Sequence, residues 1–154
     1  MIEYLVYEPH TLDPHIIISF LKETDKLVVP PLSALVDLEE YAKKITSKAV
    51  LFTAWDEGML IGLTAIYFNR APEYSYSTYT MVKREYQLVE MVGIELSKHV
   101  RDYNMSNGSA GLRYEIRKTN TQLLKYHLRR GAVILGERVY PNTNIVSLLM
   151  QISY

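Results

Sequence analysis

Cysteine is absent from the 154 residues of the chain. Without a thiol there is no disulfide framework, no thiolate metal site and no cysteine nucleophile, so covalent acyl transfer through a cysteine is excluded. The other residues that often bind metals are dispersed. His10, His15 and His99 show no metal-ligand spacing, and no cluster of Asp or Glu accompanies them. The sequence therefore predicts no metal site.

Long apolar runs and an excess of charge are lacking as well. No uninterrupted apolar run approaches the ~20 residues that a membrane span needs, and the first residues lack the pattern of a secretory signal. Seventeen Lys and Arg balance seventeen Asp and Glu, giving a formal net charge of +0, so the basic field that dominates nucleic-acid affinity is missing. We expect a soluble, cytoplasmic protein that binds neither a membrane nor nucleic acid.

Apolar residues are plentiful, at 48% of the chain, which lets a domain of this size bury a core without disulfides. No repeat, linker or low-complexity segment divides the sequence, so residues 1–154 predict a single domain. Thr11 or Asp13 can cap a first helix, Asp37 a second, and Asn120 or its competitor Thr119 a helix from Thr121 onward, while helix periodicity extends over about 86–104. Strand patterns occur at about 2–7, 49–55, 59–69, 74–82, 112–117, 133–140 and 145–153.

This order of elements predicts an α/β (α+β) fold, with a mixed, mostly antiparallel twisted sheet of about seven strands and helices on both faces. In the strand at 74–82, simple alternation places Tyr74, Tyr76, Thr78 and Thr80 on one face. The last strand is apolar and terminal. We expect it to be an exposed edge that pairs with a second copy of the chain to form a homodimer.

The segment from Val82 to Val92 joins a strand to a long helix, a layout that presents unpaired backbone N–H groups to an anionic ligand. It resembles the acyl-coenzyme A core of the GNAT N-acetyltransferase superfamily, whose signature Q/RxxGxG/A opens the helix after the fourth strand. Gln87 matches the signature, but Glu90 and Val92 replace its two glycines. The complete segment in the place of the signature is Gln87, Leu88, Val89, Glu90, Met91 and Val92.

The second part of the resemblance lies in the next helix. The family commonly has an Asn that opens this helix, a Tyr seven residues later that protonates the leaving thiolate, and a Gly that ends the helix. Asn120 and Gly131 match these positions, and His127 replaces the Tyr, with Tyr126 one residue earlier. The resemblance covers roughly residues 35–140. It implies the GNAT fold, in which the fourth and fifth strands splay apart and acyl-CoA lies in the gap.

The resemblance implies an acyl-CoA-dependent N-acyltransferase that uses acetyl-CoA as co-substrate and transfers the acyl group directly to a small amine. Asn120 would bind the pantetheine arm, although capping its helix accounts for it equally. Arg129 and Arg130 could meet the 3′-phosphate of CoA, or serve only the helix dipole and solubility. The residues implied to hold the cofactor are Thr80, Met81, Val82, Gln87, Leu88, Val89, Glu90, Met91, Val92 and Asn120.

Three residues are candidates for catalysis. His127 would protonate the leaving thiolate, because a histidine with a pKa near 6.5 can donate a proton at neutral pH; its alternative is a packing role. Tyr76 stands where many members of the family have a Glu that acts as the general base. It would shape the acceptor pocket or orient water, unless it only packs in the sheet. Glu73 could act as the base through a water, or be a solvated loop residue.

A second function class stays open. The lost glycines and the absence of a carboxylate in the strand at 74–82 also suit a catalytically inactive GNAT-fold protein that serves as a binding or assembly module. Acetyl-CoA binding separates the two hypotheses.

Overall fold

The computed structural model describes residues 1–68, 73–88 and 91–154. Within these ranges seven strands form one sheet in the order β1-β2-β3-β4-β5-β7-β6. Neighbouring strands run antiparallel, except β4 and β5, which are parallel. This confirms the predicted mixed sheet. The strands are β1 (Ile2–Tyr7), β2 (Val50–Asp56), β3 (Met59–Tyr67), β4 (Ser75–Val82), β5 (Gly111–Arg117), β6 (Val133–Val139) and β7 (Val146–Ser153).

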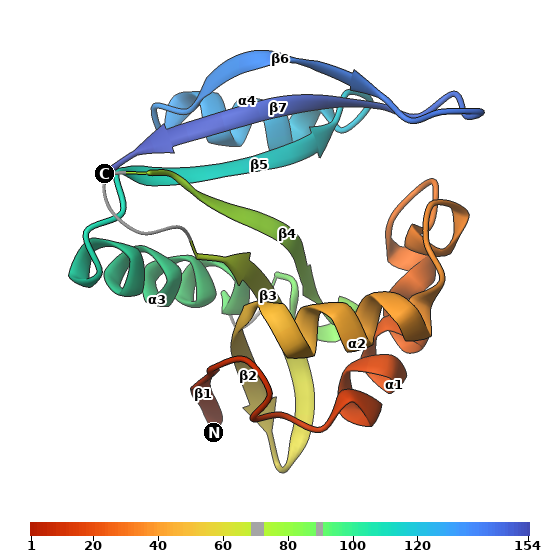
Figure 1. The fold of residues 1–154 in the computed structure, drawn as a ribbon, viewed down its shortest axis with the longest axis vertical. Coiled ribbons are helices and arrows are strands. Elements are labelled where there is room, and N and C mark those ends of the chain that lie inside the picture. Colours follow the sequence, from red (N-terminus) through yellow and green to blue (C-terminus); the bar gives the residue numbers. More distant parts are fainter. Residues whose placement is uncertain (69–72, 89–90) are drawn as a thin grey trace.

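Helices cover both faces of the sheet, as predicted (Figure 1). The α-helices are α1 (Pro14–Thr24), α2 (Leu38–Lys48), α3 (Val92–Ser106) and α4 (Thr121–Arg129), and short 3₁₀ turns are η1 (Asp25–Leu27), η2 (Leu32–Ala34) and η3 (Arg84–Tyr86). Helices α1 and α2 pack on one face of the sheet and share a core with β2, β3 and β4. Helix α3 covers the opposite face, and α4 packs against β5 and β7. In the described ranges, no helix has the length and apolar character to cross a membrane.

Local side-chain caps fix where three of the helices begin. Asp13 and Asp37 accept hydrogen bonds from the backbone N–H groups of His15 and Glu40, both at 2.9 Å. Asn120 caps α4 by accepting from the N–H of Leu123 at 3.3 Å. Each bond satisfies a donor that the first turn of a helix leaves unpaired. All three starts agree with the sequence-based expectation.

Helix α3 begins later than the sequence predicted. A helix was expected at about 86–104, but Tyr86 ends the 3₁₀ turn η3 and α3 begins only at Val92. Met91 precedes the helix with a left-handed φ of 52°, and Leu88 is 91% exposed. From Val92 onward the apolar stripe faces the sheet, and Val92 and Leu96 are buried in the core beneath α3.

Strand β4 does not alternate as predicted. Tyr76 lies opposite Tyr67 and Tyr79 lies opposite Ala65, while the register shifts between them. Tyr67 and Ala65 both belong to the α1/α2 side of the sheet, so Tyr76 and Tyr79 share that face. The extra residue of this β-bulge is Thr78, and the bulge exchanges the faces of the residues that follow it.

Strands β4 and β5 are fastened together at one end only. Their pairing is limited to Ser75 with Leu112 and Tyr76 with Arg113. A buried polar cluster secures this end: the Ser75 hydroxyl donates to Asn104 Oδ1 at 2.6 Å and lies 3.2 Å from the Ser109 hydroxyl. Past these two pairs the strands diverge toward their C-terminal ends (Figure 1).

The last strand is not an edge. Strand β7 lies between β5 and β6, so it is paired on both sides and cannot recruit a second chain as predicted. The C-terminal edge is β6, where Val133, Ile134, Leu135 and Val139 are exposed. The expectation was wrong because the strand that follows α4 takes the outer position and the final strand inserts behind it. The homodimer itself remains a prediction.

The polar cluster that fastens β4 to β5 is expected to carry measurable stability. Asn104→Ala removes the acceptor of the buried Ser75 hydroxyl and should lower the free energy of unfolding by about 1–3 kcal/mol. Asn107→Ala is the matched control, because this nearby Asn is exposed and bonds only its own helix turn; it should cost about 0.5 kcal/mol or less. Equal losses in urea unfolding would contradict this assignment.

Candidate functional site

The divergence of β4 and β5 leaves a gap between the C-terminal ends of two parallel strands. Strand β4 ends at Val82 and β5 ends at Arg117. The chain leaves β4 toward α3 and leaves β5 toward α4, so the starts of both helices follow strand ends at this side of the sheet (Figure 1). Crevices at the carboxyl ends of parallel strands are common ligand sites. We take this gap as the centre of the candidate site.

The segment that follows β4 is held by its own polar groups. The Lys83 N–H donates to Ile61 O at 2.8 Å, and the Lys83 ammonium pairs with Glu23 at 2.7 Å. The Gln87 side chain donates to Val82 O at 2.9 Å. Gln87 therefore folds back on the strand, and the carbonyl of Val82, one of the residues implied to hold the cofactor, already has a donor.

The first turn of α3 is where an anion would meet backbone N–H groups. Its N-cap, Met91, provides no side-chain hydrogen bond, and the N–H groups of Val92 and Gly93 have no acceptor within the helix because of their position. Gly93 is open: a Cβ placed there would meet nothing nearer than Val82 Cγ2 at 4.0 Å. Glu95 opposes an anion, since its carboxylate lies in the same turn, paired with Lys98 at 3.0 Å.

The predicted cofactor residues divide between this turn and the core. Thr80 is exposed and donates to the Thr64 hydroxyl at 3.2 Å. Met81, Val82 and Val92 are buried in the core, so only their backbone atoms are available to a ligand. Two of the predicted residues, Val89 and Glu90, lie outside the described residues.

On the α1/α2 face, the gap is bordered by a carboxylate that sequence analysis missed. Glu115 of β5 accepts from the Tyr76 hydroxyl at 2.6 Å and from the Tyr140 hydroxyl at 2.8 Å. Arg138 completes the group, pairing with Glu115 at 3.2 Å. Tyr76, which stands at the position where the resemblance led us to expect a Glu, thus has a carboxylate from the neighbouring strand beside it.

Further tyrosines extend this surface toward α2. The Tyr41 hydroxyl lies 2.7 Å from the Thr78 hydroxyl and donates to Thr78 O at 3.0 Å. Burial is the main cause that raises the pKa of Tyr41 and of Tyr76 above the usual range, and for Tyr76 the hydrogen bond to Glu115 adds to it. These hydroxyls stay protonated near neutral pH, so they act as hydrogen-bond donors or acceptors rather than as anions.

His127 lies on the other face of β5. It packs between α4 and the sheet, with Nδ1 at 2.8 Å from the Tyr114 hydroxyl. Burial, and secondly the charge of Arg130, lower the pKa of His127 below its usual 6.5. At neutral pH the imidazole is therefore mostly uncharged, which changes the premise on which its acid role was predicted. Protonation of a leaving group by the imidazolium would need a lower pH.

The remaining predicted residues lie away from the gap or serve the fold. Glu73 precedes β4 at its paired end: its carbonyl accepts from Ser109 Oγ at 3.1 Å, and its side chain is exposed. Asn120 caps α4. Arg130 lies over the ring of Tyr126, 4.7 Å from its centroid, and Arg129 is exposed. The structure thus brings Tyr76 to the gap but not Glu73.

Several residues at the gap escaped sequence analysis because their partners are distant in the chain. Glu115 and Tyr76 are 39 positions apart, and nothing in alternation along β5 distinguishes Glu115 from a solvated residue. Gly93 could have been recognised from the sequence, because it lies one residue after the segment that stands in the place of the glycine signature. Within the described ranges, no group of three or more His, Asp or Glu residues could hold a metal.

The lowered pKa of His127 predicts the direction in which the stability of the fold changes with pH. Unfolded histidine binds its proton near about pH 6.5, whereas folded His127 resists protonation, so the unfolded state takes up more protons as the pH falls. The free energy of unfolding should therefore fall as the pH is lowered from about 6.5 toward the pKa of folded His127. His127→Phe should reduce this loss of stability. His99→Gln is the control. A histidine titration by NMR with the His127 midpoint above that of unfolded histidine would refute the assignment.

Comparison with known proteins finds the same architecture. No protein-family model matches the chain, and no curated protein matches its sequence. Among solved structures, it is similar to the ribosomal-protein-S18-alanine N-acetyltransferase from Escherichia coli, with a TM-score of 0.75 and 16% identity over 98% of this chain and 94% of that one.

Two GNAT-family acetyltransferases are similar over nearly their full lengths. One is from Elizabethkingia anophelis, with acetyl-CoA bound, at a TM-score of 0.70 and 17% identity over 99% of this chain and 98% of that one. The other is from Streptococcus pneumoniae, at a TM-score of 0.69 and 16% identity over 99% and 100% of the two chains. At these identities the similarity establishes architecture, and it confirms the predicted fold. The chain has the GNAT acetyltransferase fold.

Proposed function

We propose that this protein is an acyl-CoA-dependent N-acyltransferase that uses acetyl-CoA and transfers the acyl group directly to a small amine. The observation that carries the proposal is the one-ended pairing of β4 and β5, with the uncapped start of α3 following the free end of β4. The fold is that of acetyltransferases, and the structure from Elizabethkingia anophelis contains acetyl-CoA.

The residues around the gap supply most of what direct transfer requires. Acetyl-CoA supplies an activated acyl group; the amine must lose a proton and the departing thiolate must gain one. On the α1/α2 face, Tyr76 and Glu115 form a hydrogen-bonded pair at 2.6 Å that can orient the amine and take up its proton. On the opposite face of β5, the Tyr114–His127 pair is our candidate for returning a proton to the thiolate, which the imidazole can do once it is itself protonated, at a pH below neutral.

One observation favours the alternative, an inactive GNAT-fold binding or assembly module. Glu95 puts a carboxylate in the first turn of α3, where a pyrophosphate would also have to lie. Like charges at one helix start repel each other. Pairing with Lys98 offsets that repulsion, and for this reason we favour the enzyme.

Calorimetric titration with acetyl-CoA tests the proposal, and Gly93 offers a charge-specific variant. We expect micromolar binding by the unaltered protein. Gly93→Asn and Gly93→Asp have nearly the same shape and the same room around Cβ, but only the Asp variant places a negative charge beside the phosphates. The Asn variant should bind acetyl-CoA nearly normally, and the Asp variant about tenfold or more weakly.

Two results of this titration would count against the enzyme. No binding at millimolar acetyl-CoA would leave the inactive module. Equal binding by the Asn and Asp variants would remove the start of α3 from the phosphate site.

The Tyr76–Glu115 pair should affect turnover rather than cofactor binding. Tyr76→Phe removes the hydroxyl that bonds Glu115 and should lower kcat/KM for an amine found by screening by about tenfold to hundredfold, with acetyl-CoA affinity unchanged. Tyr74→Phe is the control, since its hydroxyl lies 2.8 Å from Ser153 at the paired end of β4. Tyr76→Phe with unaltered kinetics would exclude this pair from the mechanism.

A further inference from the structure

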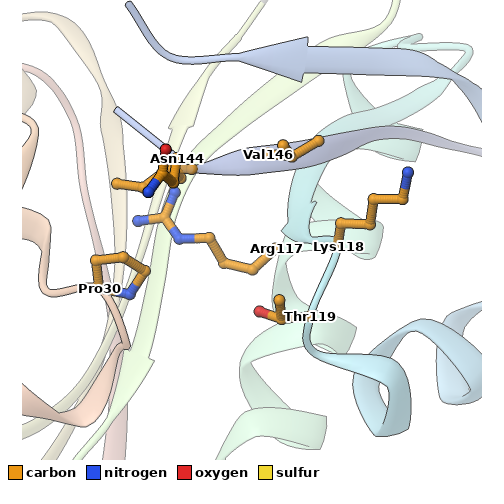
Figure 2. Close-up of a pocket in the computed structure, with 7 residues that line it drawn as sticks. Pro30, Arg117, Lys118, Thr119, Asn144 and Val146 are labelled. Atoms are coloured by element: carbon orange, nitrogen blue, oxygen red, sulfur yellow. The ribbon is translucent and has the colours of Figure 1, made fainter. Parts of the chain in front are cut away.

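A hollow lies close to Tyr140, the tyrosine that shares Glu115 with Tyr76. It has a volume of about 190 Å³ and is formed by three separate segments: the loop between η1 and η2, the end of β5, and the turn that leads into β7. Figure 2 shows the side chains around it. The lining residues are Pro30, Arg117, Lys118, Thr119, Asn144, Ile145 and Val146.

Arg117 is the distinctive group in this cavity. Its Nε–H is buried and has no hydrogen-bond partner, and Arg117 forms no ion pair among the described residues. Figure 2 shows its guanidinium extending between Pro30 and Asn144. An unsatisfied buried donor is costly, and the cost is larger for a charged group. An anion in the cavity would provide the missing acceptor.

The other charges nearby are already engaged. Lys118 lines the same cavity, but its ammonium turns away (Figure 2) and pairs with Glu137 at 2.6 Å. Arg138, the other cation near this surface, pairs with Glu115 at 3.2 Å. Among the described residues that line this cavity, Arg117 is therefore the cation that remains available to a ligand.

Tyr140 connects the cavity to the proposed reaction site. Its hydroxyl donates to Glu115 at 2.8 Å, while its ring centroid lies 5.9 Å from the guanidinium carbon of Arg117. Glu115 and Arg117 are two residues apart on β5, so they share a face at a separation of about 7 Å between their Cα atoms. A carboxylate and a guanidinium arranged in this way complement a molecule with an amine at one end and an acid group at the other.

We propose that this cavity is an acceptor subsite in which Arg117 binds the carboxylate of an amine substrate of the amino-acid class. The proposal rests on the proposed function, because it names the acceptor of the same site. The amine would lie toward Glu115 and Tyr76, and the carboxylate would accept hydrogen bonds from the Arg117 guanidinium. A volume of about 190 Å³ leaves room for a small amino acid.

The test compares carboxylates with their amides. Free L-amino acids, each paired with its own α-carboxamide, are used first as ligands in NMR titrations without acetyl-CoA and then as acceptors with acetyl-CoA. Release of CoA can be followed with a thiol-reactive dye, since the protein has no cysteine to react. The unaltered protein should favour the carboxylate of at least one pair by about tenfold or more, the range for a charge-assisted hydrogen bond.

Variants of Arg117 test whether this residue causes the preference for the carboxylate over the carboxamide. Arg117→Gln should abolish it, weakening carboxylate binding by about tenfold to hundredfold while leaving carboxamide and acetyl-CoA binding unchanged. Arg117→Lys keeps the charge without the planar fork and should retain part of the preference. Arg113→Gln is the matched control, because Arg113 lies on the same face of β5 and bonds Gln151 at 2.9 Å; it should leave the preference intact.

The outcomes separate the two proposals. Carboxylate binding that depends on Arg117, without acetyl-CoA binding, would overturn the proposed function and uphold the subsite. Acetyl-CoA binding and turnover with equal use of acids and amides would uphold the function and overturn the subsite. A carboxylate preference that survives Arg117→Gln, or no carboxylate binding at millimolar concentrations, would also overturn it.

Discussion

The one-ended pairing of β4 and β5 is the constraint on which the rest of this molecule depends. A buried cluster of hydroxyl and amide groups around Asn104 ties the start of β4 to the end of α3 and to the chain entering β5. Gly111 lets the chain enter β5 close to both of its neighbours, because a Cβ there would lie 2.7 Å from Cε1 of the Tyr74 ring, just before β4, and 2.1 Å from the carbonyl oxygen of Ile152 in β7. With one end fixed and different helices packed on each strand, the other ends separate.

The two faces of β5 carry different candidate functional groups. Alternate residues of one short strand point to opposite sides, so Tyr114 meets His127 under α4 while Glu115 meets Tyr76 under α1 and α2. A bulge at Thr78 turns Tyr76 and Tyr79 to the same side of the sheet and concentrates tyrosines there. The proposed acceptor subsite continues this surface through Tyr140 to Arg117.

Sequence reasoning reached the fold because its signals are local. The caps at Asp13 and Asp37, and the division of each helix into an apolar and a polar side, can be recognised within one segment of sequence. The structure confirms both helices. The bulge in β4 and the interior place of β7 depend on pairing with distant strands, and neither could be derived from alternation. The start of α3 was misjudged by several residues, since the left-handed Met91 leaves no periodic signature.

The site was less predictable than the fold for the same reason. Tyr76 was found through the family resemblance, but Glu115 and Arg117 acquire meaning only from partners or neighbours contributed by β4, β6 and the turn before β7. His127 was identified by position, yet its burial, which lowers its pKa, is a property of the packed helix. Chemistry that depends on burial and charge is visible only once the elements are assembled.

The most direct test of the account is an NMR titration of the isotope-labelled protein with acetyl-CoA, read at the backbone amides. The account predicts shifts concentrated at the free ends of β4 and β5 and in the first turn of α3, including Gly93. Amides of the paired ends, near Ser75 and Gly111, should stay unaffected. Shifts confined to the exposed β6 edge, or none at millimolar acetyl-CoA, would contradict the claim that the gap between these strands is the acyl-CoA site.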